Sequence, residues 1–180
     1  MSRWLCLLLL VCASAHAAPD ATTSDDTMAR FLHEKSLLLQ FEEMRSNVAG
    51  RTSDLVVTAM GFLGVPYRRG GNSAETGFDC SGFVRAMYEQ TVGLILPRKA
   101  SQQATATEVI DKKDLQPGDL VFFNTMRRAF SHVGIYVGDG KFIHSPRSGS
   151  EVRVEDMRQA YWQRRFDGAR RVTPDALAQQ

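Results

Sequence analysis

The chain has 180 residues, which is enough for one domain with its own hydrophobic core. Hydrophobic residues make up 43% and charged residues 23%, as is typical of globular proteins. The formal net charge of +2 at pH 7 gives no sign of a dense basic surface, so we expect no nucleic acid partner.

The first residues have the pattern of an export signal. Arg3 precedes the apolar residues 4–12, a run too short to cross a bilayer, which needs about 20 residues. Residues 15–17 then give the small-x-small pattern that signal peptidase reads. We predict a signal peptide over residues 1–17, export to the periplasm or cell envelope, and no transmembrane segment after cleavage. Lipid anchoring at Cys12 is the less favoured alternative, because lipobox cysteines usually follow Gly, Ala or Ser and Val11 is none of these.

The cysteine count becomes informative once this signal is removed. Of the three cysteines Cys6, Cys12 and Cys80, only Cys80 would remain in the mature protein. A single thiol in an oxidising compartment has no partner for an internal disulfide. Two interpretations stay open at this point, a small buried hydrophobic side chain or a nucleophile.

The N-terminal half of the sequence predicts helices. Residues 18–51 read as a polar N-terminus with an accessory amphipathic helix over 28–45, followed by a break at 47–52. Ser53 is a candidate N-cap for a second helix that runs to about residue 63. Gly64 then stands where a helix-terminating glycine is expected.

A third helix is expected to begin at Cys80 or Ser81, with Asp79 as its cap. From residue 115 the pattern changes to strands. We expect strands at 120–123, 132–137 and 141–145, with weaker candidates at 152–154 and 169–172. Helices followed by strands predict an α+β domain over residues 52–172, with the helices packed on a small antiparallel sheet, and a C-terminal tail at 173–180.

Cys80 therefore stands at a predicted helix start. A thiol has a pKa of about 8.5, and the species that attacks is the thiolate. Helix N-terminal N–H groups favour negative charge, and a protonated histidine nearby adds to this, so we expect a pKa lowered to about 3.5–7.5. The same N–H groups would also bind an oxyanion.

The expected base comes from a predicted hairpin that carries two histidines. If residues 138–140 form a three-residue loop, Val137 pairs with Lys141 and the alternation of side chains puts His132 and His144 on one face. The two rings then lie diagonally within reach of a hydrogen bond. A two-residue loop would instead put them on opposite faces. One cysteine and two histidines also suit zinc, but no pair has the close spacing of common zinc sites, so we expect no metal.

Several motifs in order resemble the NlpC-type family of cell-wall cysteine peptidases. The matching segments are 64–71, 78–84, 96–98, 117–123, 132–138 and 142–144. The resemblance covers about residues 52 to 172. It implies a papain-like fold without a cofactor, in which Cys80 is the nucleophile, His132 the base and His144 the third polar residue. It also implies that the Tyr67 hydroxyl points toward the nucleophile and aids the oxyanion; the alternative is a packed aromatic side chain beside Pro66.

Three further residues match the family's pattern with open roles. Asp79 and Ser81 flank the nucleophile and either contact substrate or cap the helix. Arg98 either binds a substrate carboxylate or has a structural role. The resemblance implies that the partner is the stem peptide of peptidoglycan, cut at a D-glutamyl–diamino acid bond or at a cross-link. The alternatives are an amidase or acyltransferase with the same triad, and a non-catalytic cell-wall-binding module.

Overall fold

The structure, a computed structural model, describes residues 22–125 and 127–178. The predicted signal peptide and Cys12 lie outside the described residues. The chain divides into two compact units, Met1–Glu43 and Met44–Gln180, and apart from the start of the first helix all the features discussed below lie in the second unit. No helix among the described residues is long and apolar enough to cross a membrane.

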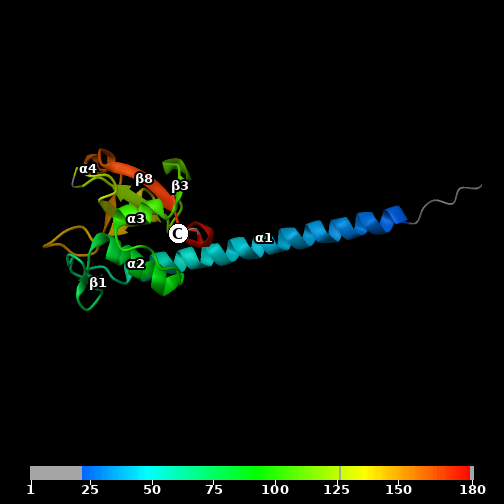
Figure 1. The fold of residues 1–180 in the computed structure, drawn as a ribbon, viewed down its shortest axis with the longest axis horizontal. Helices are drawn as coiled ribbons and strands as arrows, with labels where there is room; N and C mark the ends of the chain where they lie inside the picture. The colour runs from blue at the N-terminus through cyan, green and yellow to red at the C-terminus, as the bar shows by residue number, and fades with distance from the viewer. Residues whose placement is uncertain (1–21, 126, 179–180) are drawn as a thin grey trace, which may run out of the picture. The chain divides into compact units, whose positions relative to one another are not determined.

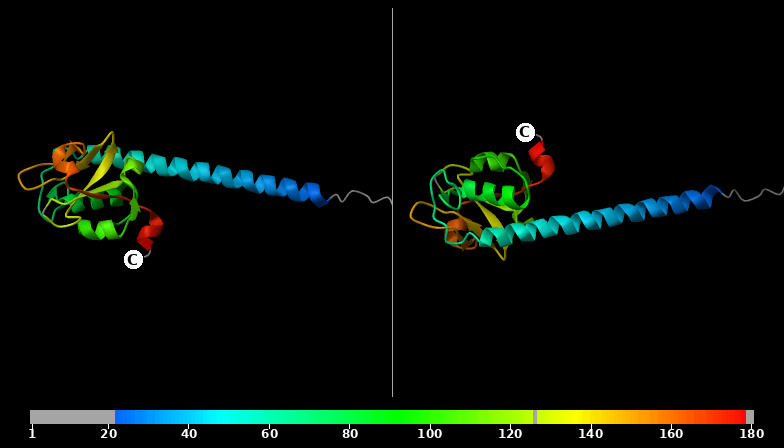
Figure 2. Two further views of the ribbon diagram at one scale, coloured as in Figure 1. Left: turned by 90° about the horizontal axis from the view of Figure 1, so that it is seen from above. Right: turned by 90° about the horizontal axis from the view of Figure 1, so that it is seen from below.

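The first helix, α1 (Thr22–Met60), is continuous, so the predicted break at 47–52 is wrong (Figure 2). The break segment contains no proline, and its one glycine, Gly50, costs a helix only about 1 kcal/mol relative to alanine. Ser53 consequently lies inside the helix and does not cap it. Turns after Met60 lead to Gly64, whose φ of +85° fits the predicted glycine stop.

A six-stranded antiparallel sheet forms the centre of the second unit, with the order β3-β8-β4-β5-β6-β7. Figure 1 labels β3 and β8, which are neighbours at one edge of this sheet. Its strands are β3 (Glu108–Ile110), β4 (Leu120–Phe123), β5 (His132–Gly138), β6 (Lys141–His144), β7 (Arg153–Asp156) and β8 (Phe166–Arg171). A separate two-stranded sheet pairs β1 (Asn72–Ser73) with β2 (Gly77–Phe78). The remaining helices are α2 (Cys80–Thr91), α3 (Ala100–Thr105), the 3₁₀ helix η1 (Lys112–Asp114), α4 (Ala160–Gln163) and α5 (Pro174–Ala178). The α+β fold class is confirmed.

The core lies on both faces of the sheet, and the alternation along β4 shows why. Leu120 and Phe122 pack into the larger cluster, together with the buried face of α2. Val121 and Phe123 point the other way, into a smaller cluster with Trp162 of α4. Successive side chains of a strand point to opposite faces, so four consecutive buried apolar residues indicate a strand covered on both sides. The site described next lies where α2 meets β5.

Candidate active site

Cys80 is the first residue of α2, as predicted. Asp79 is the N-cap, in an extended conformation with φ −92° and ψ 176°, and its Oδ1 accepts a hydrogen bond from the Gly82 N–H at 2.8 Å. Of the first-turn N–H groups, that of Ser81 contacts the sulfur of Cys80. The backbone N–H groups of Val133 and Ser81 both favour the thiolate, which places the sulfur of Cys80 beside the start of β5.

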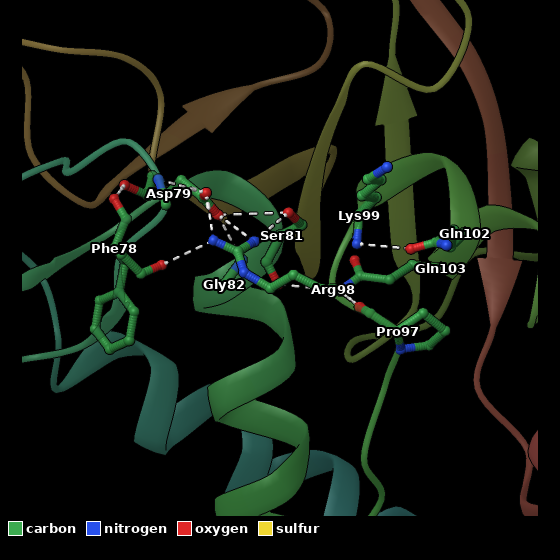
Figure 3. A network of polar contacts seen from close by, with 12 residues as sticks. Phe78, Asp79, Ser81, Gly82, Pro97, Arg98, Lys99, Gln102 and Gln103 are labelled. Atoms are coloured by element: carbon green, nitrogen blue, oxygen red, sulfur yellow. Dashed lines mark hydrogen bonds and ion pairs between the residues drawn. The ribbon is translucent and has the colours of Figure 1, made fainter.

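Asp79, Ser81 and Arg98 form one polar network (Figure 3). The guanidinium of Arg98 donates to both carboxylate oxygens of Asp79, at 2.9 and 2.6 Å, and to the Ser81 hydroxyl at 3.0 Å. The N–H of Gly70 donates to the same carboxylate at 2.9 Å. These contacts fix the start of α2 and support the structural interpretation of all three residues. A direct contact of any of them with substrate stays a prediction.

The β5–β6 hairpin differs in detail from the predicted one. Tyr136 pairs with Phe142 as expected, but Lys141 pairs with Gly138 and not with Val137. The loop is thus shorter than predicted, and the register shift between Tyr136 and Gly138 is a β-bulge that takes up the extra residue. The shorter loop and the bulge cancel each other's effect on the register, so the side chains beyond the bulge still lie on the predicted faces.

His132 and His144 consequently meet on one face of the sheet. Nε2 of His132 lies 2.6 Å from Nδ1 of His144, and the ring planes stand at 85° to each other. Both residues are buried, with 3% and 0% of their surfaces exposed. Trp162 stacks on His132 with ring centroids 5.8 Å apart and meets His144 edge-on. The aromatic cover keeps water away from the contact between the two imidazoles.

A cavity of about 590 Å³ opens over this arrangement. Tyr67, Cys80 and His132 all line it, whereas Asp79, Ser81 and Arg98 do not. The other lining residues are Thr125, Ser131, Pro146, Arg147, Arg153, Glu155, Gln159, Tyr161 and Trp162. A thiol and an imidazole in one groove can perform nucleophilic acyl chemistry.

Among the cavity-lining residues that sequence reasoning missed, two contact the histidines. Glu155 lies one residue beyond the weak strand candidate at 152–154, and its Oε2 lies 3.4 Å from Nε2 of His144. Trp162 lies on the four-residue helix α4, which is too short for a periodic pattern. A buried histidine needs partners for both ring nitrogens, and this requirement was the signal that could have directed attention to a carboxylate beyond His144.

Burial dominates the electrostatics of the site. It raises the pKa of the Cys80 thiol to about 11, with a further rise from the Asp79 carboxylate. Burial also lowers the pKa of His132 well below its usual value, and the neighbouring His144 lowers it further. The expected lowering of the Cys80 pKa is therefore wrong for the free protein, because the loss of hydration outweighs the helix N-terminus. The resting pair is a thiol beside a neutral imidazole.

The Glu155 carboxylate beside His144 stays ionised. The pKa of Glu155 falls to about 2, because the contacts with His144 and Arg153 outweigh the opposing effect of burial. The Tyr67 pKa is raised by burial and by the nearby Cys80 and Asp79, so its phenol stays protonated and able to donate. Among the described residues, no group of three His, Cys, Asp or Glu side chains is arranged to hold a metal ion.

Comparison with known proteins places the chain in a family. The model of the NlpC/P60 family matches residues 64–171. The murein DD-endopeptidase MepH of Escherichia coli is 48% identical over 119 residues, which are 64% of this chain and 44% of that protein. The gamma-DL-glutamyl hydrolase of Bacillus subtilis is 41% identical over 123 residues, which are 67% of this chain and 30% of that protein.

A crystal structure of an NlpC/P60 family protein from Bacillus cereus superimposes with a TM-score of 0.63 and 39% identity. The match covers 68% of this chain and 40% of that one. The chain thus spans less than half the length of each of these three proteins. The family match extends from the segment before the nucleophile helix through the last strand, β8, and so includes every element that lines the cavity. The chain belongs to the NlpC/P60 family, with the papain-like α+β fold that its motifs predicted.

Proposed function

We propose that the protein is an exported cysteine endopeptidase that cuts the stem peptides of peptidoglycan, with Cys80 as nucleophile, His132 as base and His144 as the residue that orients the base. The observation that carries this proposal is the 2.6 Å contact between the two imidazoles, beside Cys80 in one cavity. A non-catalytic wall-binding module would have no need of this arrangement.

The neutral resting pair defines the first chemical step. Because His132 uses Nε2 for His144, its Nδ1 is the atom available to the thiol. Nδ1 takes the thiol proton as the sulfur of Cys80 bonds to the scissile carbonyl carbon and the carbonyl electrons move onto oxygen. N–H groups at the start of α2 and the Tyr67 hydroxyl are the donors for this oxyanion.

Collapse of the tetrahedral intermediate breaks the carbon–nitrogen bond, and His132 returns its proton to the leaving amine. Water then attacks the thioester with His132 again as base, which releases the carboxylic acid and restores the thiol. An amidase or acyltransferase would share these steps and differ only in the leaving group or in the acceptor.

The relatives act on two kinds of bond by their names, a DD-endopeptidase and a gamma-DL-glutamyl hydrolase. We propose a D-glutamyl–diamino acid bond or a peptide cross-link as the substrate of this chain. Digestion of purified cross-linked and uncross-linked muropeptides, followed by mass analysis of the fragments, distinguishes the two bonds. Release of an intact stem peptide from the glycan strand would instead indicate an amidase.

The role of the nucleophile is tested with Cys80→Ser. A serine hydroxyl is activated poorly in a site tuned for a thiol, so muropeptide cleavage should be lost while the thermal unfolding midpoint stays near that of the parent. Cleavage at the parent rate by Cys80→Ser would remove Cys80 from the mechanism.

Export is tested separately by N-terminal sequencing of the protein from the cell envelope. The expected start is near Ala18, after loss of Cys6 and Cys12. A lipid-modified Cys12 at the N-terminus would instead show anchoring to a membrane surface.

A further inference from the structure

Glu155 contacts His144, the second residue of the histidine pair. His144 has no exposed surface, and its buried Nε2 lies 3.4 Å from Oε2 of Glu155, an ion-pair distance without the geometry of a hydrogen bond. The Glu155 side chain is 18% exposed and comes from β7, the strand beside β6. Resting on the function proposed above, we propose that Glu155 is a positioning residue that holds His144 as the Nε2–H tautomer and thereby keeps Nδ1 of His132 free to act as the base.

The proposal follows from counting the protons on two neutral imidazoles. Each ring carries one N–H, and one proton lies between Nε2 of His132 and Nδ1 of His144. If His132 donates, its Nδ1 keeps a lone pair for the thiol of Cys80, and the proton of His144 is on Nε2, facing Glu155. If His144 donates, its Nε2 lone pair faces the carboxylate, and His132 carries its proton on Nδ1, where it cannot accept the thiol proton.

An ionised carboxylate selects the first of these two states. It accepts hydrogen bonds and cannot donate them, so it attracts an N–H at Nε2 of His144 and repels a lone pair there. The low pKa of Glu155, about 2, keeps it ionised throughout the range in which the imidazoles are neutral. Its negative charge also favours the imidazolium that His132 becomes during attack.

Arg153 explains why this position needs a carboxylate rather than an amide. Its Nε donates to Oε1 of Glu155 at 2.6 Å and its Nη2 lies 2.5 Å from the same oxygen, which leaves Oε2 for His144. The two carboxylate oxygens can therefore accept from Arg153 and from an N–H of His144 at the same time. A glutamine has one oxygen, which the guanidinium would take, and its NH₂ group would then face Nε2 of His144 and favour the unproductive tautomer.

The test is the tautomer of His144, measured by long-range proton–nitrogen NMR correlation of its imidazole in the folded, nitrogen-15-labelled chain near pH 7.5. Signals are assigned by their loss in His144→Gln. We expect Nε2–H in the parent and a shift toward Nδ1–H in Glu155→Gln. The double variant Arg153→Met/Glu155→Gln should return to Nε2–H, because the amide oxygen is then free for the histidine.

Turnover should follow the tautomer. In Glu155→Gln we expect kcat to fall by roughly 10- to 1000-fold, within the range that acid–base catalysis contributes, with a smaller change in KM. The double variant should recover part of kcat. Asp156→Asn is the matched control, since Asp156 is the next residue of β7 and pairs with Arg158 away from the histidines.

Nδ1–H on His144 in the parent would overturn the proposal even if the variants did not fold. Unchanged Nε2–H and unchanged kcat in Glu155→Gln would also overturn it. The NMR result does not depend on substrate, so the tautomer can be as expected while Cys80→Ser remains active, in which case the proposed function fails and this inference stands as structural.

Discussion

Gly134 allows the two strands of the hairpin to come close enough for the histidines to meet. It lies on β5 opposite His144, and a Cβ added there would lie 2.6 Å from Cδ2 of Phe142, 2.9 Å from the carbonyl oxygen of Ile143 and 3.1 Å from Cβ of His144. Two of these atoms belong to the backbone or lie next to it, so rotation of a side chain cannot relieve the crowding. In Gly134→Ala, β6 must therefore move away from β5.

The size of the effect follows from these contacts. Overpacking of a buried site by one methyl group costs about 1–3 kcal/mol of unfolding free energy, which lowers the melting temperature by roughly 3–15 °C for a domain of this size. The shift also moves His144 away from His132, and a displacement of about 1 Å in a catalytic group can reduce the rate by 10²-fold. We expect a loss of muropeptide cleavage larger than the loss of folded protein explains.

Thermal unfolding by circular dichroism and initial rates on muropeptides measure both effects. Gly50→Ala is the control for the added methyl group, because nothing lies within 4 Å of a Cβ at Gly50. It should stabilise α1 by about 1 kcal/mol and leave the rate unchanged. A Gly134→Ala protein with the melting temperature and rate of the parent would refute the close approach of β5 and β6.

Three other predictions test different parts of the site. His144→Gln and His144→Asn should retain part of the activity, because an amide can still accept one hydrogen bond. His144→Ala should lose more activity, and His132→Ala should lose nearly all of it. Equal rates for His144→Ala and the parent would leave a Cys80–His132 dyad as the catalytic group. Burial lowers the folded-state pKa of both histidines below 6.5, so below that pH the unfolded chain binds more protons than the folded chain. The unfolding free energy should therefore fall as the pH decreases from 6.5, by up to about 1.4 kcal/mol per pH unit for each histidine. Urea unfolding at pH 7.5 and 5.5 should show a smaller loss in His144→Gln, and an equal loss would contradict the assignment to His144. Arg98→Met should destabilise the start of α2 by about 1–3 kcal/mol, because the half-buried Asp79 carboxylate loses its strongest donor. An unchanged melting temperature would show that the network in Figure 3 contributes nothing to folding.

Short-range patterns in the sequence predicted the elements that carry the site. Asp79 before Cys80 is a cap signal with a local physical cause, and the structure shows that hydrogen bond. The strand at 120–123 was equally clear, because four consecutive apolar residues suit a strand buried on both faces. In both cases the deciding interactions lie within a few residues of each other.

Features that depend on distant contacts were not predictable in this way. β3 has an exposed, irregular pattern and exists because it pairs with β8, about 60 residues later in the chain. The Cys80 pKa depends on how deeply the fold buries the thiol, which its neighbours in sequence do not specify. Glu155 reaches His144 only because β7 pairs with β6 in a particular register.

The bulge near Gly138 has a consequence for how this hairpin can change in length. The two histidines are 12 positions apart in sequence. They share a face because, beyond the bulge, β6 pairs with β5 in the register that aligns Tyr136 with Phe142. Hairpin tips usually tolerate insertions and deletions of any size. Here, a one-residue insertion or deletion that shifts the pairing of β6 against β5 by one residue would turn His144 to the opposite face, whereas the same change taken up by loss or gain of the bulge would preserve the pair. Length variation at this tip is therefore restricted to changes that leave the register beyond the bulge intact, although the tip itself contacts no substrate group in the proposed mechanism.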